Sequence, residues 1–331
     1  MTGTDEIDTQ ILTWLRAADG ALSGEELARR LGCSRAAVWK RVAGLRRQGY
    51  KIEGRHADGY ALAASPDRLG PRELVPYLTG TWRDVRWYAE VDSTQRVARD
   101  LARAGAAEGT TVIAERQTAG RGRLGRQWHS PGGLNLYASI ILRPPLVPSA
   151  VPQLALVAGV AVAGAVGEET GRRPAIKWPN DVLLDGYKIC GILTEMDSEV
   201  DRVHYVVAGV GVNLNTPESG FPPELRAKAS SLMLVTGRRI DRAAFTGRLL
   251  AALEARYGRF LSEGFGKSVR TEWESYSCLT GTEVQVATPD GDRSGRVLGL
   301  DHDGALKLEN ADRTIVRIVA GEVTVRDGYG R

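Results

Sequence analysis

Residues 117–128 read QTAGRGRLGRQW, and this stretch decides how the middle of the chain is built. It lies between two apolar, strand-like runs, so it is a loop and not the glycine-rich opening of a Rossmann helix; the Lys-Ser/Thr ending of a P-loop is also absent. Its three glycines permit close backbone approach, and its three arginines offer fixed forks of donors for phosphate or carboxylate oxygens. We expect either a lid that orders over an anionic ligand or a flexible basic surface loop.

The segments on both sides of this loop predict a mixed α/β domain. Apolar runs predict strands at 85–91, 110–114, 134–142, 175–177, 188–194 and 203–212. Helical patterns cover 93–103, 153–170 and 241–261. After Lys188 the strands follow one another too closely for crossover helices, and no βαβ repeat is evident. The sheet is therefore expected to be mixed or antiparallel.

Two further motifs in this domain carry polar groups at strand ends. Residues 177–181 read KWPND, and residues 185–193 read DGYKICGIL, in which Asp185-Gly186 forms a hairpin turn that delivers Lys188 onto the next strand. A lysine in an apolar run is costly unless an anion accompanies its ammonium group. That anion is either a ligand or the carboxylate of a structural ion pair. A third motif, Asp92-Ser93-Thr94-Gln95, shows by itself only that a helix starts.

The N-terminal 64 residues show the order of a winged helix-turn-helix. Helical spacing of apolar residues, a capping-box serine at Ser23 and a turn at Gly32-Cys33 precede a third helix that Ser34 can cap. A glycine-containing hairpin follows at 50–62. Between Leu27 and His56 nine basic residues face one acid, which is Glu53. A solvated basic face is the alternative, but fold and charge together favour DNA binding. The predicted DNA-binding residues lie in the third helix and its cap: Ser34, Arg35, Ala36, Lys40 and Arg41.

Beyond about residue 279 the pattern changes to five short strands separated by turns, which suggests a small SH3-like β-barrel. The predicted fold class is therefore α+β and multidomain. Its parts are a winged helix-turn-helix at 1–64, a mixed-sheet catalytic domain at 65–278 and the barrel at 279–331.

Composition limits the class of protein. The chain has 331 residues, of which 25% are charged, and its net charge is +4, so it is an ordinary globular protein of two or three domains. Three scattered cysteines and four histidines exclude a disulfide framework and a cysteine-rich zinc site. The first residues lack a signal peptide, and the apolar run at 154–167 is shorter than a membrane span. We expect a cytoplasmic protein without a membrane partner.

The sequences GRGRLGRQW at 120–128, KWPND at 177–181 and KICGIL at 188–193 together resemble the signature of biotin protein ligases. With the winged helix in front, the chain is similar to the bifunctional type, which is both a ligase and a biotin operon repressor. The resemblance covers nearly the whole length, and its first two motifs are highly specific. It implies a central domain of the class II synthetase-like kind, biotin and ATP as substrates, and Mg²⁺.

The resemblance also implies roles for individual residues. Those expected to be catalytic are Lys188, Arg121 and Arg123. Those expected to bind biotin are Ser93, Thr94, Gln95, Gln117, Arg121, Gly122, Arg123 and Lys188. Those expected to bind ATP or the adenylate are Arg126, Trp128, Lys177, Asn180, Asp181, Asn213 and Arg326, and Asp181 is the candidate Mg²⁺ ligand. Gln95 stands where asparagine is common in the family, so its direct contact with biotin is in doubt.

The implied reaction forms biotinyl-5′-AMP and then biotinylates a lysine of a biotin carboxyl carrier protein, such as that of acetyl-CoA carboxylase. No nucleophile-base constellation is visible, which agrees with a reaction that needs no covalent enzyme intermediate. Operator DNA and a second copy of the chain are the other expected partners. Three alternatives stay open: a ligase whose winged helix no longer regulates, a related lipoate-type ligase, and a transcription regulator with a degenerate, ligand-sensing core.

Overall fold

The computed structural model describes residues 3–55 and 59–325. It divides the chain into two compact units, Met1–Pro76 and Tyr77–Arg331. The boundaries predicted at 64/65 and 278/279 fall in connecting segments, after the second strand and before the first strand of the C-terminal sheet, and they stay predictions.

The first unit contains the helices and the hairpin of a winged helix-turn-helix. Its elements are α1 (Gly3–Ala17), α2 (Gly24–Leu31), α3 (Arg35–Arg47), the antiparallel strands β1 (Lys51–Arg55) and β2 (Gly59–Ala64), and the short α4 (Pro71–Leu74). Ser23 begins α2 by accepting a hydrogen bond from the backbone N–H of Glu26 at 3.0 Å, and Gly32 ends it with φ of +63°. The helices share a core that includes Ile11, Leu12, Leu27, Val38, Val42 and Leu45.

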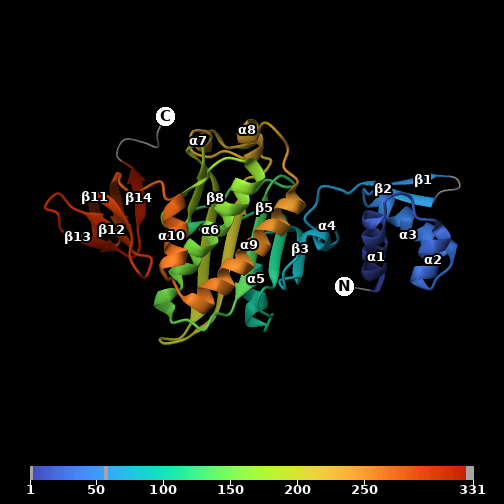
Figure 1. Cartoon of the computed structure of the whole chain (residues 1–331), viewed down its shortest axis with the longest axis horizontal. Helices are drawn as coiled ribbons and strands as arrows, with labels where there is room; N and C mark the ends of the chain where they lie inside the picture. Colours follow the sequence, from blue (N-terminus) through green and yellow to red (C-terminus); the bar gives the residue numbers. More distant parts are fainter. Residues whose placement is uncertain (1–2, 56–58, 326–331) are drawn as a thin grey trace. The chain divides into compact units, whose positions relative to one another are not determined.

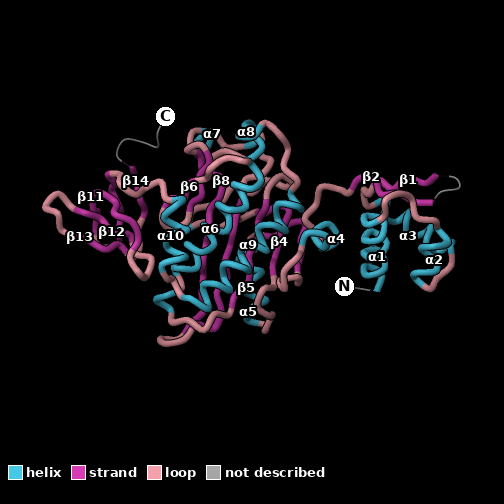
Figure 2. Tube along the Cα trace, in the orientation of Figure 1, coloured by secondary structure: helices cyan, strands magenta, loops and turns pink. Residues whose placement is uncertain are grey.

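The second unit is built on a seven-stranded sheet (Figures 1 and 2). Its strands are β3 (Val85–Val91), β4 (Thr111–Gln117), β5 (Leu136–Leu142), β6 (Ala175–Lys177), β7 (Asp181–Leu184), β8 (Tyr187–Ser198) and β9 (Val203–Val212), in the order β3-β4-β5-β9-β8-β7-β6. Only β3 and β4 pair in parallel, across helix α5 (Thr94–Arg103); the other pairs are antiparallel. The sheet is therefore mixed, as the sequence predicts, with one βαβ unit and no repeat of it.

Helices cover the two faces of this sheet differently. On one face lie α6 (Pro152–Thr170), α9 (Arg242–Glu263) and α10 (Lys267–Tyr276), of which α6 packs so closely that Gly159 lies against Ile176 and Ile192 (Figure 1). Helix α6 is the one helix in the described residues that is long and apolar enough to span a membrane, but 72% of it is buried, so it is a core helix. Helix α5 packs on β4, β5 and β9.

Four elements of the second unit are absent from the sequence prediction. They are β7, α10 and the short helices α7 (Pro223–Arg226) and α8 (Leu232–Thr236). Strand β7 and the short helices span only one turn or a few residues, so they show no periodicity. Helix α10 buries only Val269 and Trp273, so its sequence, KSVRTEWESY, carries almost no apolar stripe.

The C-terminal part is an antiparallel five-stranded sheet. Its strands are β10 (Glu283–Thr288), β11 (Gly291–Leu300), β12 (Leu306–Glu309), β13 (Ile315–Ile318) and β14 (Glu322–Val325), in the order β13-β12-β11-β10-β14. It contacts the central domain through buried groups: Trp178 donates a hydrogen bond from its indole nitrogen to the carbonyl of Gly304 at 3.2 Å. Strand β14 and the loop 117–128 both lie in the second compact unit.

Candidate functional site

Three glycines make a flat patch on the paired strands β8 and β9. Gly191 pairs with Gly211, and Gly209 precedes Gly211 by two residues, so all three lie on the face opposite α6. A Cβ atom at Gly211 would lie 2.6 Å from Nε1 of Trp128, and one at Gly209 would lie 2.5 Å from Oε1 of Gln95. The patch therefore lets both side chains lie directly on the sheet. None of the three glycines is among the predicted site residues, although glycine inside an apolar strand signals such close approach.

A buried polar network lies beside this patch, at the start of α5. The backbone N–H of Thr94 donates to Oε1 of Gln117 at 2.8 Å, and the amide of Gln95 donates to the carbonyl of Val207 at 2.9 Å. The hydroxyl of Ser139 donates to Oε1 of Gln95 at 3.0 Å, so Ser139 belongs to the network although it was not predicted. The hydroxyl of Ser93 is buried and, within the described residues, has no hydrogen-bond partner. A buried hydroxyl without a partner indicates a polar ligand.

The structure brings the predicted quartet of Ser93, Thr94, Gln95 and Gln117 together at the patch. Ser93 occupies the position before α5 but makes no capping hydrogen bond, so its hydroxyl is not used to start the helix. The side-chain amide of Gln95 donates two hydrogen bonds to strand carbonyls, to Val207 at 2.9 Å and to Leu193 at 3.4 Å. The longer glutamine side chain is therefore tied to the sheet.

The loop 117–128, called the lid below, folds over the glycine patch. Backbone hydrogen bonds within the loop fix its shape. The N–H of Gly122 donates to the carbonyl of Arg126 at 2.7 Å, and the N–H of Trp128 donates to the carbonyl of Gly120 at 2.9 Å. Leu124, at the tip, has φ of 56° and is 77% exposed, so a left-handed turn places an apolar side chain in solvent.

The three arginines of the loop reach three different partners. Arg121 pairs with Glu195 on β8 at 3.2 Å. Arg123 donates to Oδ1 of Asn180 at 3.1 Å, and burial lowers the pKa of its guanidinium group. Arg126 makes a two-pronged ion pair with Glu322 on β14. The loop is therefore fastened to the sheet, to the KWPND motif and to the C-terminal domain.

Lys188 stands at the centre of the site. Its ammonium group lies 2.7 Å from Oδ1 of Asp181 and 5.5 Å from the centre of the Trp128 ring. The turn that delivers it is formed by Asp185 and Gly186, both with positive φ, as predicted. The lysine thus has a carboxylate partner, and an anionic ligand must share the lysine with Asp181. Lys177 lies nearby, and burial lowers the pKa of its amino group.

The segment 214–229 borders the site on the other side. The backbone N–H of Lys188 donates to the carbonyl of Lys228 at 2.9 Å, and His129, which follows the lid, hydrogen-bonds to the carbonyl of Gly220 at 2.8 Å. Asn213 is buried, and its amide donates to the carbonyl of Ser230 at 3.1 Å. The structure thus places Asn213 as an anchor of this segment. Arg326 lies outside the described residues.

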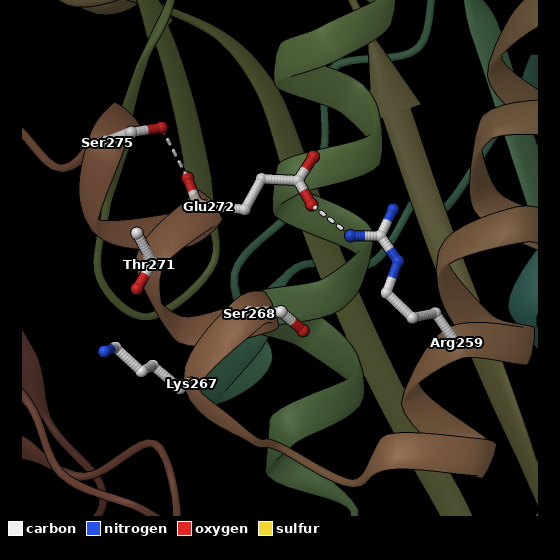
Figure 3. A pocket seen from close by; sticks show the side chains of 6 residues that line it. All are labelled: Arg259, Lys267, Ser268, Thr271, Glu272 and Ser275. Carbon is white, nitrogen blue, oxygen red and sulfur yellow. Dashed lines mark hydrogen bonds and ion pairs between the residues drawn. The ribbon is translucent and has the colours of Figure 1, made fainter.

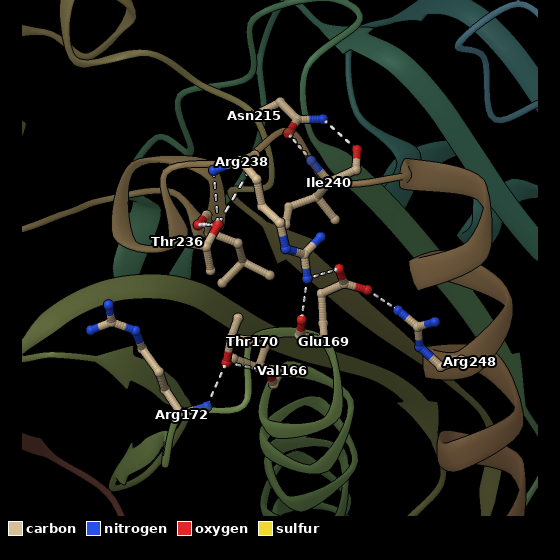
Figure 4. A network of polar contacts seen from close by, with 10 residues as sticks. Val166, Glu169, Thr170, Arg172, Asn215, Thr236, Arg238, Ile240 and Arg248 are labelled. Atoms are coloured by element: carbon tan, nitrogen blue, oxygen red, sulfur yellow. Dashed lines mark hydrogen bonds and ion pairs between the residues drawn. The ribbon is translucent and has the colours of Figure 1, made fainter.

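Polar contacts hold the start of this segment to Ile240 and hold the neighbouring Arg238 to α6 (Figure 4). Asn215 and the backbone of Ile240 exchange two hydrogen bonds, of 2.9 and 2.8 Å. Glu169, near the end of α6, pairs with Arg238 and Arg248. The base of the segment 214–229 is therefore fixed, while its middle borders the site.

The open groove in Figure 3 is separate from this site. It lies between the end of α9 and helix α10, and its lining consists of Arg259, Lys267, Ser268, Thr271, Glu272 and Ser275. The carboxylate of Glu272 is paired with Arg259 at 3.1 Å and with Arg256 at 2.8 Å. None of the predicted site residues lines this groove.

Possible metal ligands occur at two places in the described residues. Asp301, His302 and Asp303 form an exposed group on the C-terminal domain, but Arg317 pairs with both aspartates. At the candidate site Asp181 supplies a carboxylate. Mg²⁺ is commonly held by one or two carboxylates with substrate phosphates and water, and this donor fits that pattern.

In the first unit, α3 presents most of the predicted DNA-binding residues to solvent. Ser34 caps the helix by accepting a hydrogen bond from the N–H of Ala37 at 3.3 Å, and Arg35, Ala36 and Lys40 are exposed. Arg41 instead lies toward α1, with its guanidinium group 3.7 Å from the buried carboxylate of Asp8. The structure therefore separates Arg41 from the other four.

Comparison with protein families assigns all three parts of the chain. The family described as Biotin/lipoate A/B protein ligase matches residues 87–213, a helix-turn-helix (HTH) domain matches 8–61, and the biotin protein ligase C-terminal domain matches 280–326.

Individual relatives agree with this assignment. The chain is 41% identical to the bifunctional ligase/repressor BirA of Bacillus subtilis, over 89% of this chain and 91% of the relative. It is 32% identical to the protein of the same name from Escherichia coli, over 92% of each chain. A biotin protein ligase from Aquifex aeolicus, in complex with biotin and ATP, superposes with a TM-score of 0.64 and 32% identity, over 73% of this chain and 98% of that one. The chain belongs to the biotin protein ligases, among those with an N-terminal helix-turn-helix domain that are named bifunctional ligase/repressors.

Proposed function

We propose that this chain activates biotin with ATP, transfers it to a lysine of a biotin carboxyl carrier protein, and represses transcription by binding operator DNA. The observation that carries the ligase activity is one arrangement of groups. An arginine-rich lid folds over a glycine patch, with the unpartnered hydroxyl of Ser93 at one end of the patch and the ammonium group of Lys188 at the other. This arrangement suits a flat, largely apolar ligand with a polar head and a carboxylate tail.

The reaction has two displacements. A carboxylate oxygen of biotin attacks the α-phosphorus of ATP, the bond to the bridging oxygen breaks, and pyrophosphate leaves. The amine of the acceptor lysine then attacks the carbonyl carbon of biotinyl-5′-AMP, the bond to AMP breaks, and the amine loses a proton. Both steps depend on positioning and on charge stabilisation.

The proposed roles are those that the family resemblance implies, and the positions of the side chains support them. Ser93, Thr94 and Gln117 bind the ureido ring, while Gln95, held by the strand carbonyls, shapes that end of the glycine patch. Lys188 and Arg121 balance the negative charge that develops around the carboxylate and the phosphate. Gly122 lets the lid approach the ligand closely, and the closed lid excludes water, which would hydrolyse the mixed anhydride.

The nucleotide lies against a second set of groups in this proposal. They are Arg126, Trp128, Lys177, Asn180, Asp181 and Asn213, and the family resemblance adds Arg326, which lies outside the described residues. Mg²⁺ would be held by Asp181 together with oxygens of ATP, and it would neutralise part of the negative charge of the triphosphate.

The ligase proposal is tested by pyrophosphate release. The purified chain is expected to release pyrophosphate when biotin and ATP are both present, and to label a biotin carboxyl carrier domain. Lipoate in place of biotin is expected to give neither product. Pyrophosphate release that depends on lipoate would favour the lipoate-type ligase. Absence of release with either biotin or lipoate would favour a transcription regulator whose core senses a ligand without catalysing a reaction.

Gly211→Ala is expected to weaken the binding of ATP about tenfold while the fold survives. The new methyl group would lie 2.6 Å from the indole of Trp128, so the ring must leave its place on the sheet. Calorimetric titration with α,β-methylene-ATP, which cannot release pyrophosphate, in the presence of biotin measures the effect. The matched control is Gly258→Ala, because a Cβ there meets open space. Unchanged ATP affinity in the Gly211 variant would remove Trp128 from the nucleotide site.

The repressor proposal rests on the winged helix-turn-helix at 1–64, with the catalytic domain at 65–278 and the C-terminal domain at 279–331. The exposed start of α3 and its cationic side chains support it. One winged helix reads a single half-site, so the repressing form is a homodimer. The use of ATP and of a carboxyl carrier protein, both of which are intracellular, supports a cytoplasmic location.

DNA binding is expected to require a dimer and to weaken steeply with salt. Nine basic residues cluster between positions 27 and 56, so binding releases counterions from several phosphates. Gel shifts over a series of salt concentrations, with and without biotin plus ATP, give the slope of log affinity against log salt. Sedimentation of the same complex gives its stoichiometry. A slope near zero, or tight binding by a monomer, would contradict the proposal.

A further inference from the structure

Trp39 on α3 is the one exposed tryptophan among the seven of the chain. All seven lie in the described residues, and Trp39 is 62% exposed. The buried side of α3 is formed by Val38, Val42 and Leu45, so Trp39 points away from the core of its domain. Burial of a large apolar side chain is favourable, and the N-terminal domain does not bury this one.

The surroundings of Trp39 fit a nucleic acid. Arg35 precedes it by one helical turn and Lys40 follows directly, and neither has an ion-pair partner in the described part of the chain. By contrast Arg46 on the same helix donates to the carbonyl of Ile52 at 2.8 Å and so serves the wing. An indole between cations that are free to bind phosphate is complementary to DNA in both charge and shape.

Small side chains on either side of Trp39 leave its indole standing free. Ala36 precedes it by three residues and Ala43 follows it by four, the two spacings that place helical neighbours on one surface. Helix α3 can therefore enter the major groove of DNA with the indole of Trp39 closest to the base pairs.

We propose that Trp39 contacts the C5-methyl group of a thymine in the major groove and so contributes to sequence recognition. The proposal rests on the proposed DNA-binding function and goes beyond it by naming the group that is read. Base edges in the major groove are polar except for this methyl group, which makes it the partner for an apolar side chain. Phosphate contacts position the helix but carry no sequence information.

The test compares Trp39→Ala with Lys40→Ala in the full-length protein. Duplexes enriched by the wild type from a randomised pool, in the presence of biotin and ATP, serve as probes. We expect Trp39→Ala to bind about tenfold more weakly at every salt concentration, with an unchanged salt slope. Lys40→Ala is expected to lower the slope by about one. Unchanged biotin-dependent pyrophosphate release shows that the catalytic domain of both variants is folded, and circular dichroism with thermal unfolding of both variants reports the fold of the N-terminal unit, which contains the substitutions.

Replacing single thymines of the enriched duplex with uracil removes one methyl group at a time. At the contacted position the wild type is expected to lose about fourfold in affinity per methyl group, whereas Trp39→Ala binds both duplexes equally. Trp39→Phe, which keeps an apolar ring, should retain part of the discrimination. Equal affinity of Trp39→Ala and wild type, or a uracil penalty that persists in Trp39→Ala, would overturn the proposal. A wild type that binds no duplex would instead overturn the repressor function itself.

Discussion

Lys188→Ala is expected to abolish adenylation of biotin while the chain still folds. The ammonium group faces Asp181 at 2.7 Å, and the reacting carboxylate and phosphate must come to the same place. Without the lysine, these negative groups lose the cation that lies closest to Asp181. The Lys188 side chain is 34% exposed, so the full cost applies only where ligand and closed lid exclude water from it. There, losing one member of a desolvated charge pair costs roughly 2–5 kcal/mol, which corresponds to a rate loss of about 30- to several-thousand-fold.

Biotin-dependent pyrophosphate release measures this loss directly. Lys267→Ala is the matched control, because Lys267 is an exposed lysine that lines the separate groove of Figure 3. Circular dichroism of both variants reports the fold. Normal pyrophosphate release by a folded Lys188→Ala protein would refute the role of this lysine.

The sequence predicts six of the seven strands of the sheet, and the loop, because their signals are local; the four-residue strand β7 is too short to give such a signal. Apolar runs mark each long strand of the central domain, and the alternation of glycine and arginine at 120–126 marks a loop near an anion. Asp185 and Gly186 mark the turn before Lys188, and both have the positive φ that such a turn requires.

The sequence could not predict which partners the charged side chains would choose. Glu195 and Glu322 are ordinary acids in strands, and only the folded chain brings them to Arg121 and Arg126. The same holds for Ser139, a lone hydroxyl in the buried strand β5 that hydrogen-bonds to Gln95. Such pairs join residues far apart in sequence, so no local pattern specifies them.

The glycine patch shows an intermediate case. Gly191, Gly209 and Gly211 are visible as glycines inside apolar strands, which weakens a strand and indicates that something approaches closely. What approaches them becomes clear only from the register that pairs Gly191 with Gly211 under Trp128.

Arg123→Gly is expected to separate formation of biotinyl-5′-AMP from its retention. Arg123 joins the lid to Asn180 at 3.1 Å and approaches the carbonyl of Gly321 at 3.5 Å, while Lys188 lies on the strand beneath and acts on the reacting groups. Loss of the arginine should therefore loosen the closed lid more than it slows the chemistry. Each ~1.4 kcal/mol of lost contact raises the dissociation rate about tenfold.

The released anhydride would then acylate lysines of bystander proteins, so blotting for biotin after incubation with ATP, biotin and albumin measures the leak. Leu124→Gly is the matched control: it places a glycine in the same loop, but Leu124 is 77% exposed and its φ of 56° suits glycine without strain. The control should label albumin no more than the wild type does, because it removes no contact of the lid. Equal labelling by wild type and Arg123→Gly, with adenylate synthesis intact, would mean that the lid is held closed by its other two arginines.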